Sequence, residues 1–244
     1  MRAIAPALLL LITSCGQGNG PANQGADRPG PQRPVDAPAP LPTIAITANG
    51  PGGCAATWDG QTVTPDQVAA RGVALLERAV AAVGGVQHVT DRNMPSPLVE
   101  APADLGFACA DTILFALQRS GLTSVMLRPA GGQAPIRADF PLQMEALPPP
   151  TPMVLGLGAG GRVSWNDRTL DAGALEVELN QHGTTEAPAP GEPENPPGDM
   201  DLLVSREATF GQLYALLQAT RRHHLRPFLR LPSAGAQAPS SPSR

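Results

Sequence analysis

Residues 58–63 read Trp-Asp-Gly-Gln-Thr-Val, and residues 165–170 read Trp-Asn-Asp-Arg-Thr-Leu. In each stretch a tight-turn dipeptide directly follows a tryptophan, which is typical of a β-hairpin. Short apolar segments that read as strands precede both tryptophans, and a helix pattern follows both turns. The chain therefore carries two copies of one structural unit.

Each copy continues in the same order after its hairpin. Thr64 and Pro65 suit the N-cap and the first position of the first helix, and Gly121 suits a helix end. The expected later elements are a strand at 98–99, a helix over 108–119 and a strand at 124–128, then a helix around 175–179, a strand at 202–204, a helix over 210–220 and a strand at 227–230. We predict an α/β (α+β) protein of two tandem two-layer domains, each hairpin-helix-strand-helix-strand, with helices on one face of a small mixed sheet.

Composition sets the expected boundaries. Residues 16–41 hold almost no large apolar side chain, so this segment cannot bury enough surface to fold. The expected parts are a signal peptide (1–14), a lipidated cysteine with a Pro/Gly-rich tether (15–41), a first domain (42–130), a Pro-rich linker (131–151), a second domain (152–232) and a disordered tail (233–244).

The N-terminus has the pattern of an export signal. Arg2 precedes an apolar run over 3–12, which at about ten residues is too short to span a bilayer as a helix. The following Leu-Ile-Thr-Ser-Cys at 11–15 resembles the bacterial lipobox, which implies cleavage before Cys15 and lipid on that cysteine. The alternative is an ordinary secretory signal. Because Gly16 follows the cysteine, the resemblance favours a periplasmic protein anchored to the outer membrane.

Export also bears on the other two cysteines. Cys54 and Cys109 form an even pair in an oxidising compartment, so a disulfide is the economical interpretation. The alternative is two buried free thiols. No Cys/His cluster has the spacing of metal ligands, and we predict no metal and no cofactor.

Charge and motifs restrict the class of function. Twenty-one acidic against seventeen basic residues, without a basic cluster, exclude the footprint of a nucleic-acid-binding protein. Residues 156–161 satisfy G-x-G-x-x-G but lead into a strand, so we interpret them as a hairpin turn. Asp111 is expected on an exposed face, and the two tryptophans are expected to anchor the sheets. Nucleophile and metalloenzyme motifs are missing, and we predict a protein that is not an enzyme.

One short arginine- and histidine-containing run is a candidate binding site. Residues 221–226 read Arg-Arg-His-His-Leu-Arg at the end of a predicted helix. The first interpretation is a solvated helix end, where cations are favoured. The second is a patch formed by Arg221, Arg222 and Arg226 that contacts peptidoglycan carboxylates or an acidic partner.

The order of elements and the two Trp hairpins resemble the periplasmic domain of the ExbD/TolR family of biopolymer-transport proteins. The resemblance covers both copies and implies a non-catalytic adaptor or scaffold for a TonB/Tol-type system, with envelope proteins of TonB, Tol or ExbB type as partners. The alternative is a peptidoglycan-binding envelope module, and an enzyme of unrecognised type is a distant third. The family's proton chemistry uses an aspartate in a transmembrane helix, for which this chain has no candidate.

Overall fold

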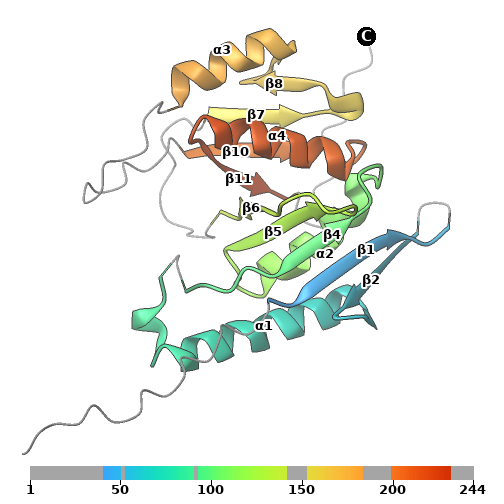
Figure 1. Cartoon of the computed structure of the whole chain (residues 1–244), viewed down its shortest axis with the longest axis vertical. Coiled ribbons are helices and arrows are strands. Elements are labelled where there is room, and N and C mark those ends of the chain that lie inside the picture. Colours follow the sequence, from blue (N-terminus) through green and yellow to red (C-terminus); the bar gives the residue numbers. More distant parts are fainter. Residues whose placement is uncertain (1–40, 51–52, 91–92, 142–152, 184–198, 232–244) are drawn as a thin grey trace, which may run out of the picture. The chain divides into compact units, whose positions relative to one another are not determined.

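The computed structural model describes residues 41–50, 53–90, 93–141, 153–183 and 199–231 (Figure 1). Cys15, the tether, most of the predicted linker, the proline-rich segment 184–198 and the tail lie outside the described residues. The first repeat comprises β1 (Thr43–Ala48), β2 (Cys54–Trp58), β3 (Gln61–Val63), α1 (Pro65–Ala82), β4 (Leu98–Ala101), α2 (Phe107–Arg119) and β5 (Ser124–Pro129). After β6 (Ile136–Asp139), the second comprises β7 (Met153–Leu157), β8 (Val163–Trp165), β9 (Arg168–Leu170), α3 (Ala172–His182), β10 (Asp199–Val204), α4 (Phe210–Arg222) and β11 (Arg226–Arg230).

The strands of the described residues form one mixed sheet with the order β3-β2-β1-β4-β5-β6-β11-β10-β7-β8-β9. The predicted mixed α/β class is therefore confirmed. The division into two tandem domains is not confirmed, because both repeats contribute strands to this sheet and the described residues fall within one compact unit.

The two Trp hairpins have the same backbone geometry. The Asp59 amide donates to the Thr43 carbonyl over 2.8 Å, and the Asp59 carboxylate accepts from the Thr43 amide over 2.8 Å. Asn166 makes the same two bonds to Val154, each also 2.8 Å. Both turn residues have a positive φ, 49° and 46°, which Asp and Asn tolerate better than most residues. The repeated turn therefore has a local chemical cause.

Helix starts are capped by side chains. Thr64 forms a capping box with Gln67 at the start of α1, and Pro65 occupies an early helical position, as predicted. Thr209 and Gln212 form the same box at the start of α4. These local bonds satisfy amide groups that the first turn of a helix leaves without partners.

The core lies on one face of the sheet. Strand side chains alternate between buried and partly exposed positions, and the buried positions form one apolar cluster with the helices. Trp58 and Trp165 are both 5% exposed and belong to this cluster, which confirms that they anchor the packing. The opposite face carries ion pairs, with Glu100–Arg128 and Asp201–Arg230 both at 2.7 Å.

Strand β6 corrects the predicted linker. Residues 136–139 lie within that segment, yet they pair antiparallel with β5 and contact β11 at Phe228. Their sequence alternates as a strand does, because Ile136 and Ala138 are buried while Arg137 and Asp139 belong to the polar face. The strand joins the two repeats.

A second connection joins the first turns of α2 and α4. The Phe107 amide donates to the Ala208 carbonyl over 2.7 Å, and the Phe210 amide donates to the Leu105 carbonyl over 2.8 Å. Each repeat thus satisfies a backbone group at the helix start of the other. This reciprocal exchange, together with a strand order that is symmetric about β6, indicates an approximate twofold relation between the two repeats.

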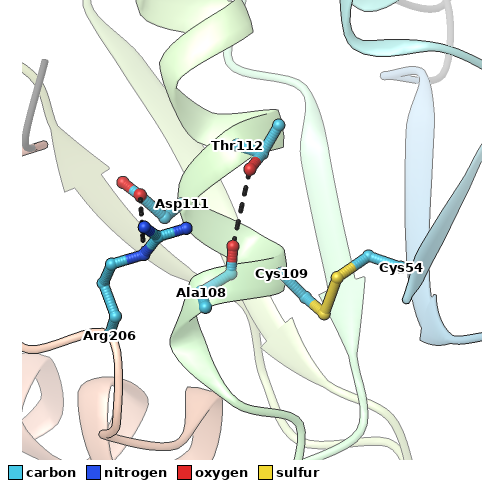
Figure 2. The surroundings of a disulfide bond; sticks show 6 residues. All are labelled: Cys54, Ala108, Cys109, Asp111, Thr112 and Arg206. Carbon is cyan, nitrogen blue, oxygen red and sulfur yellow. Dashed lines mark hydrogen bonds and ion pairs between the residues drawn. A yellow bond between two sulfur atoms is a disulfide. The ribbon is translucent and has the colours of Figure 1, made fainter. Parts of the chain in front are cut away.

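The predicted cysteine pairing is present in the structure. Cys54 of β2 and Cys109 of α2 form a disulfide whose Cα atoms are 5.5 Å apart, across 55 residues of chain (Figure 2). The bond connects the hairpin of the first repeat to its second helix. The second repeat has no corresponding cysteines.

Candidate functional site

The structure separates the three arginines that the sequence grouped. Arg221 and Arg222 are exposed in the last turn of α4. Arg226 instead lies in β11, where its Nε is 3.0 Å from Oδ2 of Asp139 and its terminal nitrogen is 3.2 Å from Oδ1. Its guanidinium also lies 5.3 Å from the centre of the Phe228 ring. The predicted three-arginine patch is therefore wrong for Arg226, which stabilises the sheet.

Arg221 and Arg222 line a surface groove, which we call the α4 groove. Its volume is about 630 Å³. One wall is the outer side of α4, and the other is the segment that leads into β6. The lining residues are Ala134, Pro135, Ile136, Tyr214, Ala215, Gln218, Arg221 and Arg222.

Helical spacing explains why α4 supplies this wall. Buried residues recur along α4 from Phe210 to Thr220, while Ala215 and Gln218 are exposed on the opposite side. Residues three or four positions apart lie on the same face of a helix. Hence Ala215, Gln218 and Arg222 form one exposed stripe, with Arg221 at its side.

Hydrogen bonds fix the two walls to each other. The Tyr214 hydroxyl donates to the carbonyl of Ala134 over 2.6 Å, and Nε2 of Gln218 donates to the same hydroxyl over 3.0 Å. Tyr214 is only 3% exposed, so its ring packs inward while its hydroxyl holds the lead-in segment. The groove therefore has a defined width.

The basic end of the groove is not neutralised locally. Within the described parts of the chain, no acidic side chain forms an ion pair with Arg221 or Arg222. His223, the next residue along the chain, contacts an acid on another helix: its Nε2 lies 2.9 Å from Oε1 of Glu176 in α3. The carbonyl end of α4 favours cations there, but it supplies only part of a charge for two guanidinium groups.

The groove breaks the approximate twofold. Its lead-in wall, residues 134–136, leads into and begins β6, and the described residues of the second repeat contain no strand equivalent to β6. The counterpart of α4 is α2, which carries the disulfide instead. The groove therefore arises from a segment that the repeat itself does not predict.

Sequence reasoning identified Arg221 and Arg222 but not the rest of the groove. Tyr214 is the only tyrosine in the chain and lies four residues before Gln218, which is a spacing that brings two helical side chains together. The sequence spacing therefore could have predicted the contact between Tyr214 and Gln218. It could not have predicted the contact of Tyr214 with Ala134, 80 residues away.

Other sequence motifs have structural explanations. Residues 158–161 form the turn between the antiparallel strands β7 and β8, as predicted, with the Gly158 amide donating to the Arg162 carbonyl over 2.7 Å. The predicted solvated helix end does not include His223, whose side chain is only 11% exposed. Among the described residues, no group of three or more His, Cys, Asp or Glu side chains has the arrangement of a metal site.

Edges of the sheet offer little to a partner strand. The two edge strands, β3 and β9, contain three residues each. Strand addition depends on a row of free backbone groups, so these short edges offer a partner strand few groups to pair with.

Asp111 is buried at the contact between the repeats, contrary to its predicted exposure. The residue is 7% exposed, its Oδ1 has no hydrogen-bond partner, and its Oδ2 lies 3.9 Å from Nε of Arg206. Figure 2 shows Asp111 facing Arg206 on the side of α2 away from the disulfide. Burial raises the pKa of the Asp111 carboxyl, and the positive charge of Arg206 opposes part of this rise.

The raised pKa of Asp111 predicts a pH dependence of stability. An acid whose pKa is higher in the folded state than in the unfolded state favours folding when it is protonated. Its contribution to stability is therefore fully present below the unfolded-state pKa of about 3.9, and it is lost as the pH rises through the folded-state pKa. As the pH rises from about 4, the free energy of unfolding should therefore fall less for the Asp111→Asn variant than for the wild type. Urea unfolding at several pH values measures this. The matched control is Asp104→Asn at an exposed position, and equal slopes for both variants would contradict the prediction.

The described helices and the comparisons with other proteins add two findings. No helix among the described residues has the length and apolar character needed to cross a membrane. Comparison of the chain with protein-family models, curated proteins and solved structures gave no match. The resemblance to the ExbD/TolR family, and the functions it implies, therefore stay predictions.

Proposed function

We propose that this protein is a non-catalytic, lipid-tethered envelope adaptor that captures a partner protein in the α4 groove. The observation that carries the proposal is the groove itself, which places two guanidinium groups without a described acidic partner beside a firmly bonded wall. Binding sites combine a concave apolar surface with a few placed polar groups. The resemblance to the ExbD/TolR family gives the class of partner, namely proteins of TonB, Tol or ExbB type.

The compartment follows from two features of the chain. A disulfide such as Cys54–Cys109 persists in oxidising compartments, of which the bacterial periplasm is one. The lipobox-like segment ending at Cys15 supplies the anchor, and Gly16 directs it to the outer membrane.

Lipid attachment predicts a defined effect of Cys15→Ala. The variant should not incorporate a fatty-acid label, and it should accumulate as an uncleaved precursor because the lipid is added to that thiol. Metabolic labelling with an alkyne fatty acid, followed by gel analysis, measures both. Cys54→Ala serves as the control, since its thiol is not the proposed acceptor. Equal labelling of the Cys15→Ala variant and the wild type would refute the anchor.

Partner capture is tested in cells with a double substitution. The Arg221→Ala/Arg222→Ala variant should recover about tenfold less cross-linked partner than wild type, because both charged contacts of the groove are removed. Arg78→Ala/Arg162→Ala is the matched control, since it removes the same charge from exposed positions elsewhere. Equal recovery by all three proteins would contradict the proposal.

The alternative, binding to peptidoglycan, predicts a different result. Its stem peptides carry carboxylates that Arg221 and Arg222 can pair with. Sedimentation with isolated sacculi, free of protein, separates the two functions. Binding that depends on the two arginines and needs no partner protein would favour the cell wall over the adaptor.

A further inference from the structure

The two arginines of the α4 groove select for carboxylates. Arg221 and Arg222 are adjacent in the last turn of α4 and both are exposed. A guanidinium group presents several N–H donors in a plane that matches a carboxylate. Two such groups in one groove favour a ligand with more than one acidic group.

The lining of the groove disfavours ligand rings that need an aromatic surface to stack on. Its only aromatic residue, Tyr214, is 3% exposed, and its hydroxyl is engaged by Ala134 and Gln218. Stacking of sugars or bases requires an accessible ring face. The apolar lining consists of Ala215, Pro135 and Ile136, which suits small aliphatic side chains and proline.

Polar groups along the groove suit a peptide backbone. Gln218 donates one N–H to Tyr214, which leaves its second N–H and its carbonyl oxygen to pair with an amide group. The exposed stripe of α4 continues from Ala215 past Gln218 to Arg222, so the apolar and charged parts of the groove follow each other along the helix.

Together these features identify a ligand class. We infer that the α4 groove binds an extended acidic peptide segment of a partner protein, with its carboxylates on Arg221 and Arg222 and its aliphatic or proline residues over Pro135 and Ala215. The inference rests on the proposed adaptor function and names the chemistry of the partner.

A labelled peptide tests the inference directly. A suitable probe reproduces residues 184–198 of this chain, which contain three glutamates, five prolines and no basic residue. Its matched control has the three glutamates replaced by glutamine. Fluorescence anisotropy with the purified full chain should give an affinity for the acidic probe about tenfold or more above that for the neutral one. The difference should shrink as NaCl rises from about 0.05 to 0.5 M.

Variants locate the binding. Arg221→Ala/Arg222→Ala should lose about tenfold in affinity, and Arg221→Glu/Arg222→Glu should prefer a probe with lysines in place of the glutamates. Arg78→Ala/Arg162→Ala should bind as wild type. Because all of these positions are exposed, the two Ala variants should unfold near the temperature of wild type. The Glu variant should unfold at a slightly lower temperature, since the carbonyl end of α4 favours cations. The unfolding temperature therefore separates lost binding from lost folding.

Three results would overturn the inference. One is equal affinity for the acidic and neutral probes, and another is equal affinity of the wild type and the Arg221→Ala/Arg222→Ala variant. The third is binding that appears only after Glu186, Glu192 and Glu194 of the chain are changed to Gln, which would assign the groove to the chain's own segment instead of a partner. If cross-linked partner recovery still depends on the groove arginines in any of these cases, the adaptor function stands and only the peptide chemistry fails.

Discussion

Changing both Cys54 and Cys109 to Ala is expected to lower the free energy of unfolding by about 3–4 kcal/mol, because the disulfide closes a long loop and restricts the unfolded chain. The separation of 55 residues makes this restriction large. Cys54 is exposed, so little of the loss comes from packing at that end. Urea unfolding of the oxidised full chain measures the difference.

The reduced wild type provides the control for this substitution. Its unfolding midpoint should fall to that of the Cys54→Ala/Cys109→Ala variant, and the variant should not respond to the reductant. The first repeat alone carries the bond, so hydrogen exchange should increase most in β2 and the start of α2, which it connects. A midpoint unchanged by either treatment would contradict the stabilising role.

The second large effect is expected for Asp139→Ala, at about 3 kcal/mol of lost stability. Oδ1 of Asp139 accepts from Nε of Arg137 over 2.9 Å, and Oδ2 accepts from Nε of Arg226 over 3.0 Å, while the side chain of Asp139 is 8% exposed. Removing the buried member of a charge group costs about 3–5 kcal/mol. The lower end applies because the two arginine side chains are 30% and 33% exposed, and water compensates part of the loss.

Asp201→Ala is the matched comparison for Asp139→Ala. It removes a carboxylate that pairs with Arg230 over 2.7 Å on the same face of the sheet. That arginine is 42% exposed and the acid pairs with one cation, so the expected cost is about 1 kcal/mol or less. Chemical unfolding of both variants measures the two costs. Equal losses would show that Asp139 does not have its predicted role in joining β6 to β11.

The sequence predicted only part of the candidate site. Arg221 and Arg222 were predicted because a basic run at a helix end is visible in the sequence. Arg226 was grouped with them because it is near in sequence, but a strand begins at that residue and turns its guanidinium toward Asp139, 87 positions earlier. The groove's second wall was missed for the same reason, since residues 134–136 look like part of a linker until β6 pairs with β5 and β11.

Local chemistry in the sequence was sufficient for the repeated hairpins, the capped helices, the mixed α/β class and the pairing of the two cysteines. Each depends on neighbours within a few positions, or on the presence of just two cysteines after Cys15. Only the tertiary structure decided that both repeats share one sheet, that Asp111 is buried, and that a groove forms beside α4. These features depend on which surfaces meet after distant segments pack, and the free energy of that packing comes from contacts that no local pattern records.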